Sequence, residues 1–202
     1  MAKVESFSIA SFAAELKARA VTYQEEEITL RAGGKSHWYV DVKKGLSRSR
    51  MLAQAGELII DSLNQRNIDY ENVCGMGIGG EVIKGAMLAG FINTGKDISF
   101  VTANDDVSPG QRYGYGLHGG DVKIGKTLAV DDVSTTANSL ITMIDMVRDG
   151  GGIVENADVL VDRSRGEAAL ALSNMGVVLH ALLELDESSG LLVPIPATPL
   201  DQ

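Results

Sequence analysis

The sequence predicts an α/β protein with a mostly parallel central sheet flanked by helices. Short apolar segments alternate with amphipathic stretches along the chain, and no internal repeat or low-complexity tract interrupts them. Strands that alternate with helices are joined by crossovers, which give a parallel sheet covered on both faces. The chain has 202 residues, 45% of them hydrophobic, so it can bury one sizeable core. We expect one domain over residues 1–187 and a C-terminal tail over 188–202.

The N-terminal part is expected to contain two helices and a hairpin. Ser11 to Tyr23 has apolar residues at helical spacing, with Ser11 as the N-cap. The acidic run Glu25 to Glu27 is predicted to be a solvated turn, because adjacent side chains do not converge on a metal. Ile28 to Val42 is predicted as a hairpin broken at Gly33-Gly34. Met51 to Gln65 carries one apolar face and is predicted as a helix.

The remainder of the chain alternates regularly between apolar strands and helices. The predicted strands are Asn72–Met76, Ile98–Thr102, Thr127–Val130, Ala157–Val161 and Val177–Leu183. The predicted helices between them are Glu81–Ala89, Asn138–Asp149 and Gly166–Met175. The proline-containing residues from Ser188 onward are expected to form a loosely ordered arm, used at a subunit contact.

Charge and cysteine content restrict the partners and the compartment. A formal charge of −9 argues against nucleic acid and membrane surfaces, which both attract basic faces. The single cysteine, Cys74, excludes an internal disulfide framework and lies in an apolar stretch that suits the core. The N-terminus has no signal-like apolar stretch, and no run of 18 apolar residues occurs. We therefore expect a cytoplasmic protein.

The most informative segment is Thr127 to Ser139, TLAVDDVSTTANS. Its apolar start predicts a buried parallel strand, and ligands of open α/β sheets bind where such strands end. Asp131 and Asp132 would stand at that edge, followed by hydroxyl and amide side chains. The turn into the next helix would present free backbone N–H groups to a phosphate. The alternative is a plain strand followed by an N-capped helix, although capping accounts for only one of these polar residues.

This segment resembles the phosphoribosyl-pyrophosphate (PRPP) signature of type I phosphoribosyltransferases. In that family the two acids face the ribose hydroxyls and the following loop holds the 5-phosphate. The resemblance implies the type I phosphoribosyltransferase fold, with a small N-terminal hairpin as a hood over the site. Ala137 and Asn138 stand where the family usually has Gly beside another small residue.

Three further segments are similar to the orotate branch of this family, and the stretch from Val130 through Gly166 resembles its actinobacterial members. Ile28 to Asp41 (ITLRAGGKSHWYVD) resembles the opening hairpin, to which Lys35, His37, Lys43 and Lys44 add positive charge. Gly75 to Gly80 (GMGIGG) resembles the pyrophosphate loop, although glycine-rich turns are common in α/β folds. Val159 to Gly166 (VLVDRSRG) resembles the strand whose arginine contacts the base.

The resemblance also assigns roles to individual residues. The catalytic positions are Asp131 and Asp132. The PRPP-binding positions are Arg31, Gly79, Gly80, Asp131, Asp132, Val133, Ser134, Thr135, Thr136, Ala137, Asn138 and Ser139. The orotate-binding positions are Trp38, Tyr39, Thr135 and Arg163. Two alternatives stay open: Trp38 and Tyr39 as strand residues that face opposite sides, and Arg163 as a surface arginine paired with Asp162.

One segment departs from the family pattern. Family members follow the equivalent of Phe100-Val101 with an Arg-Lys-x-x-Lys-x-His-Gly loop, which closes over PRPP from the neighbouring subunit. The positions that differ here are Ala103, Asn104, Val107 and Pro109. Preorganised cations stabilise a leaving diphosphate, and losing one such group typically costs about a hundredfold or more in rate. Arg112, His118 or Mg²⁺ could replace the lost charge.

The resemblance implies a Mg²⁺-dependent transferase that makes orotidine monophosphate from PRPP and orotate in pyrimidine biosynthesis. It also implies a homodimer, with the metal carried mainly by PRPP and no dedicated metal site on the protein. Two other functions remain open because of the altered loop. The first is a phosphoribosyltransferase for another base, and the second is a non-catalytic module that binds PRPP or a nucleotide.

Overall fold

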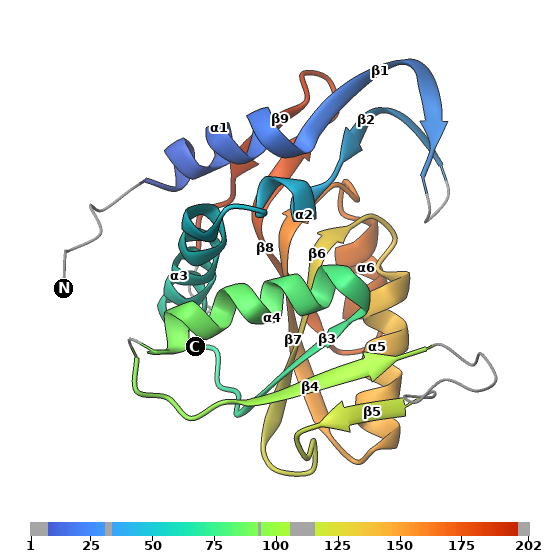
Figure 1. The fold of residues 1–202 in the computed structure, drawn as a ribbon. Helices are drawn as coiled ribbons and strands as arrows, with labels where there is room; N and C mark the ends of the chain where they lie inside the picture. Colours follow the sequence, from blue (N-terminus) through green and yellow to red (C-terminus); the bar gives the residue numbers. More distant parts are fainter. Residues whose placement is uncertain (1–7, 31–33, 93, 106–115, 198–202) are drawn as a thin grey trace, which may run out of the picture.

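The computed structural model describes residues 8–30, 34–92, 94–105 and 116–197, and its central sheet has seven strands (Figure 1). The parallel strands are β3 (Asn72–Met76), β4 (Ser99–Asn104), β6 (Lys126–Ser134), β7 (Ile153–Asp162) and β8 (Val178–Asp186). The antiparallel edge strands are β5 (Gly116–Gly119) and β9 (Leu191–Pro194). Their order across the sheet is β5-β4-β3-β6-β7-β8-β9. This arrangement confirms the predicted fold class.

Helices cover both faces of the sheet. Figure 1 shows α3 (Ser49–Gln65) and α4 (Gly77–Ile92) on one side, and α5 (Asn138–Asp149) and α6 (Glu167–Ser173) on the other. The core is divided in the same way, because successive strand side chains point to opposite faces. In β6, Leu128 and Val130 belong to the cluster under α3 and α4, whereas Ala129 belongs to the cluster under α5. Cys74 is fully buried in the second cluster, as predicted.

An N-terminal unit lies over one end of the sheet (Figure 1). It consists of α1 (Ile9–Ala20), the hairpin of β1 (Val21–Thr29) and β2 (Lys35–Val40), and the single turn α2 (Val42–Gly45). The N-cap of α1 is Ser8, whose side chain accepts a hydrogen bond from the Ser11 backbone N–H, so the prediction of Ser11 as the cap is wrong. Among the described helices, none is long and apolar enough to cross a membrane.

The acidic run lies in a strand, so the prediction of a turn at Glu25 to Glu27 is wrong. β1 already begins at Val21, and its pairing with β2 is irregular between Tyr23 and Ile28. The three glutamates are exposed, which explains why the strand tolerates them. Their solvated state follows the prediction, but their backbone conformation does not.

Two regular elements at the predicted site are longer than expected. β6 continues through the acid doublet to Ser134, because its pairing with β7 extends to Ser134 opposite Asp162. Asp131 and Asp132 therefore belong to the rigid sheet rather than to the loop that follows. The glycine-rich turn Gly77 to Gly80 is likewise part of a regular element, the first turn of α4.

The chain after Ser188 is not a loose arm in the described range. The Asp186 side chain accepts hydrogen bonds from the hydroxyls of Ser188 (2.7 Å) and Ser189 (2.6 Å), which closes a tight turn. The turn leads into β9, which pairs with β8 from Leu191 opposite Asp186 to Pro194 opposite Leu183. Pro194 does not disrupt the sheet because it ends an edge strand, where a missing N–H is tolerated.

Candidate active site

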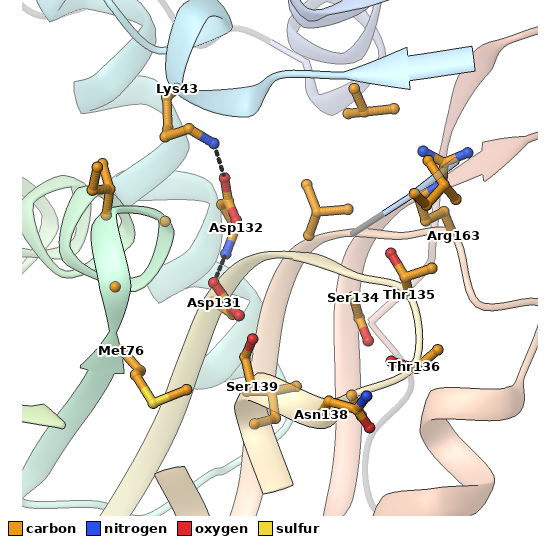
Figure 2. A pocket seen from close by; sticks show the side chains of 18 of the residues that line it. Lys43, Met76, Asp131, Asp132, Ser134, Thr135, Thr136, Asn138, Ser139 and Arg163 are labelled. Atoms are coloured by element: carbon orange, nitrogen blue, oxygen red, sulfur yellow. Dashed lines mark hydrogen bonds and ion pairs between the residues drawn. The ribbon is translucent and has the colours of Figure 1, made fainter. Parts of the chain in front are cut away.

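A cavity of about 480 Å³ opens at the carboxyl ends of β3, β6 and β7, beside the N-terminal hairpin (Figure 2). Its volume lies within the usual range of small-molecule sites. Described residues of β2, α2, the first turn of α4 and the β6–α5 loop line it. Its position is the one at which open parallel sheets bind their ligands.

The acid doublet forms one wall of this cavity. Asp131 Oδ1 accepts a hydrogen bond from the Asp132 backbone N–H at 2.8 Å. Asp132 Oδ2 accepts a hydrogen bond from Lys43 Nζ at 3.3 Å. Burial, followed by the neighbouring Asp132 charge, raises the pKa of Asp131 to about 7. Gly79 lies against both carboxylates so closely that any Cβ there would collide with Asp132. The glycine therefore permits the first turn of α4 to approach the acids.

The opposite wall is the β6–α5 loop, residues 134–139. Ala137 adopts a left-handed conformation (φ 60°), and none of the described side chains caps the first turn of α5. The N–H groups of that turn are therefore open to the cavity, where the helix dipole favours an anion. Ser134 Oγ and Thr136 Oγ1 are buried and have no hydrogen-bond partner among the described residues. Buried hydroxyls normally find a partner, so this loop has unused capacity for a ligand.

Every predicted residue from Val133 to Ser139 lines the cavity, together with Asp131 and Asp132. Gly79 lines it as well. Gly80 is buried and packs against Gly75, since a Cβ at Gly80 would come within 2.9 Å of the Gly75 Cα. Gly80 therefore fits a packing role better than a ligand contact. Gly77 supplies the positive φ (62°) with which α4 begins, and it lines the cavity too.

Arg163 lies on the side of the cavity opposite Lys43 (Figure 2). It is buried, and its Nε and one terminal nitrogen donate to Glu187 Oε1 at 3.2 and 2.6 Å. The same guanidinium donates to the Trp38 carbonyl (3.2 Å) and to Ser36 Oγ (2.9 Å). The alternative of a surface arginine paired with Asp162 is therefore wrong. Arg163 joins the end of β7 to the hairpin and to the β8–β9 turn.

The two aromatic residues of the hairpin lie on opposite sides of β2. Tyr39 lines the cavity and is half exposed. Trp38 instead donates its indole N–H to the Glu187 carbonyl at 3.0 Å and packs over Gly190. Because strand side chains alternate, one residue can face the ligand only if its neighbour turns away. The structure does not bring the Trp38 ring to the cavity.

The altered loop is described only in part. Ala103 is buried in β4, and Asn104 ends that strand, paired with Gly116 of β5. His118 also lies in β5 and lines a separate hollow with Glu81 and Lys84, so the suggestion that it enters the site is wrong for this structure. Four other residues of the prediction fall outside the described residues: Arg31, Val107, Pro109 and Arg112.

The roles of two residues of the site could not be predicted from the sequence. The sequence shows Lys43 only as one of several basic residues, because its proximity to Asp132 depends on how α2 docks on the sheet. Glu187 is the last residue of the predicted domain, and the sequence assigns it no role. Their sequence separations from their partners, 89 and 24 residues, leave no local signal that a periodicity could detect.

The donor set can be tested against the metal that the resemblance implies. Within the described residues, no three His, Cys, Asp or Glu side chains come together as a metal site. Asp131 and Asp132 nevertheless supply carboxylate oxygens, and Mg²⁺ is commonly held by one or two carboxylates together with substrate phosphates. The site therefore fits a Mg²⁺ ion that arrives with a diphosphate better than an ion held by the protein alone.

Comparisons with known proteins agree with this architecture. No family model matches the chain. The chain is 30% identical to the orotate phosphoribosyltransferase of Methanopyrus kandleri over 166 residues, which cover 82% of this chain and 84% of that protein. A crystal structure of the Mycobacterium tuberculosis orotate phosphoribosyltransferase superposes with a TM-score of 0.73 at 25% identity, covering 90% and 98% of the two chains.

A second structure of the M. tuberculosis enzyme, in complex with PRPP, has a TM-score of 0.68 at 25% identity and covers 89% of this chain and 90% of that one. The fold is thus that of the phosphoribosyltransferases. Within the class, the chain belongs to the orotate phosphoribosyltransferase family.

Proposed function

We propose that this protein transfers the phosphoribosyl group of PRPP to orotate, releasing pyrophosphate and forming orotidine 5′-monophosphate for pyrimidine biosynthesis. One observation carries the proposal. A pair of carboxylates faces an uncapped helix start with two unpartnered buried hydroxyls across one cavity. Carboxylates accept hydrogen bonds from sugar hydroxyls, and free N–H groups bind phosphate, so the two walls match the two ends of a ribose 5-phosphate.

The donor would span these two walls. Its 5-phosphate would take the N–H groups of residues 136–139 and the hydroxyls of Ser134 and Thr136. Its ribose hydroxyls would donate to Asp131 and Asp132, which are held in β6 and cannot move aside. The diphosphate would lie toward Gly79, where the absence of a side chain leaves room beside the acids. A substrate fixed at both ends presents its reacting carbon in one orientation, which lowers the barrier by proximity.

The bond changes define what the remaining residues must do. Orotate N1 gives its electron pair to C1 of the ribose, and the C1–O bond breaks with its pair on the departing pyrophosphate. The N1 proton passes to solvent. Negative charge grows on the leaving group, so the site must supply positive charge or hydrogen-bond donors there. Asp131 and Asp132 are the residues that would help to hold a Mg²⁺ ion, which would supply positive charge for the leaving group.

The base would occupy the end of the cavity between Tyr39, Thr135 and Arg163. Tyr39 offers a flat ring, which suits the face of a pyrimidine. Four N–H bonds of Arg163 are used within the protein, which leaves one terminal N–H for the carboxylate or carbonyl edge of orotate. The Glu187 partner holds the guanidinium in place but also offsets its charge.

Three further properties are part of the proposal. Mg²⁺ is expected to arrive with PRPP. A homodimer is expected from the resemblance, and sedimentation velocity at micromolar concentration would test it. A cytoplasmic location is supported by the buried, unpaired thiol of Cys74, which suits a reducing compartment.

A steady-state assay tests the function itself. The protein would be incubated with PRPP, Mg²⁺ and orotate, and pyrophosphate release would be followed. We expect release that requires orotate and is abolished in the Asp131→Asn, Asp132→Asn double variant. Release with uracil, adenine or hypoxanthine but not with orotate would assign another base. No release with any base, despite a higher melting temperature with PRPP, would favour a binding module.

A further inference from the structure

The cavity has few cations for a ligand as anionic as PRPP. Among the described residues that line it, the positively charged side chains are Lys43 and Arg163, against the carboxylates of Asp105, Asp131 and Asp132. Arg163 is already paired with Glu187 at 2.6 Å. Two positions that carry cations in the family loop are here Ala103 and Asn104. Lys43 is therefore the described cation best placed to meet a diphosphate.

The backbone of Lys43 is fixed on three sides. Asp41 caps α2 by accepting the Lys44 backbone N–H on its Oδ1 at 3.2 Å. Val42 is fully buried, and Gly45 packs so tightly on α1 that a Cβ there would collide with Leu16. The α-carbon of Lys43 thus has a set position beside the cavity. Any movement must come from its four-carbon side chain.

That side chain is held loosely enough to move. Its Nζ lies 3.3 Å from Asp132 Oδ2 and 3.6 Å from Asp41 Oδ1, and 43% of the side chain is exposed. Ion pairs at this exposure are weak, because water competes for both partners. Burial lowers the pKa of Lys43, but the charges of Asp132 and Asp41 outweigh this effect and raise it overall. Lys43 is therefore a fully charged ammonium held at the acid doublet by weak bonds.

We propose that Lys43 leaves Asp132 when PRPP binds and donates its Nζ hydrogen bonds to the diphosphate, in place of a cation missing from the loop. This inference rests on the proposed function. The exchange leaves both groups hydrogen-bonded: Asp132 becomes free to accept a ribose hydroxyl, and the ammonium meets the charge of the leaving group beside Gly79. Figure 2 shows Lys43 directed toward Asp132 at the acid end of the cavity, which is the side on which the diphosphate would lie.

The neighbouring Lys44 provides a matched control. It has the same charge, lies on the same helical turn and is likewise exposed, but it does not line the cavity. The variants Lys43→Met, Lys43→Arg and Lys44→Met would be compared with the wild type by calorimetric titration with PRPP and with ribose 5-phosphate, both with Mg²⁺. Ribose 5-phosphate has no diphosphate, so it reports the rest of the site alone.

We expect Lys43→Met to weaken PRPP binding by about 10- to 100-fold, the usual effect of losing a hydrogen bond to a charged group. Ribose 5-phosphate binding should change by less than about threefold, since a solvated charge is screened at that distance. Lys43→Arg should recover most of the PRPP affinity, and Lys44→Met should match the wild type. In turnover, Lys43→Met should lower kcat as well as the affinity for PRPP.

Two results would overturn this role. If Lys43→Met binds PRPP as the wild type does, the lysine makes no contact with the diphosphate. If it weakens PRPP and ribose 5-phosphate equally, Lys43 acts only through Asp132. Should Lys43→Met fail to fold, as judged by circular dichroism, Lys43→Gln, which also removes the charge, would replace it and must show the same loss of affinity for PRPP but not for ribose 5-phosphate. A wild-type protein that binds no PRPP would refute the proposed function as well.

Discussion

At the residue scale, the β6–α5 loop differs from other described segments because its buried hydroxyls without a partner line the cavity. Ser134 Oγ and Thr136 Oγ1 are buried beside the cavity without a partner among the described residues. Leaving a hydroxyl unsatisfied costs about 1–3 kcal/mol. A phosphate that accepts from these hydroxyls would remove that cost, so the loop is less stable alone than when a ligand is bound.

This reasoning predicts opposite effects of Thr136→Val on stability and on binding. The isosteric methyl removes an unsatisfied group, so the free energy of unfolding should stay unchanged or rise by up to about 1 kcal/mol. The affinity for ribose 5-phosphate should fall by about tenfold, through loss of one hydrogen bond to a charged group. Urea denaturation and calorimetric titration measure the two quantities.

Thr127→Val is the matched control, because Thr127 Oγ1 is also buried and unpartnered but lies at the other end of β6, outside the cavity lining. It should affect stability in the same direction and leave binding unchanged. Equal loss of affinity in both variants would contradict a phosphate contact at Thr136.

At the element scale, prediction was accurate where local pattern decides the structure. The span Asn72–Met76 of β3 and the span Asn138–Asp149 of α5 match their predicted bounds, because a continuous apolar run and an amphipathic period are local signals. The acids of β6 were correctly placed at the cavity. Their continuation of the strand was not predicted, since it depends on pairing with β7.

The elements that prediction missed are the two edge strands and the single turn α2, together with the contacts that hold the hairpin. β5 and β9 are four residues each, too short for a periodic signal, and their partners decide their conformation. The Arg163–Glu187 pair depends on how the β8–β9 turn meets the hairpin. Such tertiary contacts determine which face of β2 meets the cavity, so the sequence could name Trp38 and Tyr39 but not choose between them.

The Arg163–Glu187 ion pair gives a prediction for the stability of the hairpin. Glu187→Ala would leave the Arg163 guanidinium buried without its carboxylate, since the two side chains are 4% and 15% exposed. Removing one partner of a buried pair typically costs about 3–5 kcal/mol, and the free energy of unfolding in urea should fall by about 3 kcal/mol. Amide exchange in β2 should become faster.

Glu184→Ala, on an exposed position of β8, serves as the control and should change the stability by less than about 0.5 kcal/mol. A Glu187→Ala variant as stable as this control would show that the Arg163–Glu187 pair does not hold the hairpin.

On the scale of the whole molecule, a buried cluster of charged and polar side chains lies between the end of α3 and the sheet. Arg66 pairs with Asp158 at 3.2 Å, with both side chains 4% exposed, and His180 lies beside Asp158 in the β7–β8 pair. His180 also makes a 3.0 Å hydrogen bond with Asn156. Burial, and then the Arg66 charge, lower the pKa of His180 to about 4. The folded protein therefore keeps this histidine neutral.

The contribution of His180 to the stability of the fold should consequently depend on pH, opposite in sign to that of Asp158, whose pKa is raised by burial to about 7. An unfolded histidine takes up a proton near pH 6.5, whereas His180 in the folded state does so only near pH 4, so unfolding binds a proton between these values. The contribution of His180 to the free energy of unfolding is complete above about pH 6.5 and is lost as the pH falls toward 4. Between pH 7 and pH 5 this histidine should lower the free energy of unfolding by about 2 kcal/mol.

Urea denaturation at both pH values measures the effect. His180→Gln, which keeps a hydrogen-bonding side chain but cannot titrate, should lose that part of the pH dependence. The same change with pH in both proteins would show that His180 is not its source.

The most direct measurement of the central claim is a crystal structure of the protein with PRPP and Mg²⁺. We predict the 5-phosphate on the N–H groups of residues 136–139, the ribose hydroxyls on Asp131 and Asp132, and the diphosphate beside Gly79. That result would establish that the cavity holds the donor although the Arg-Lys-Lys-His pattern is absent from the loop. A donor bound elsewhere, or a phosphate that makes no contact with the β6–α5 loop, would contradict the account.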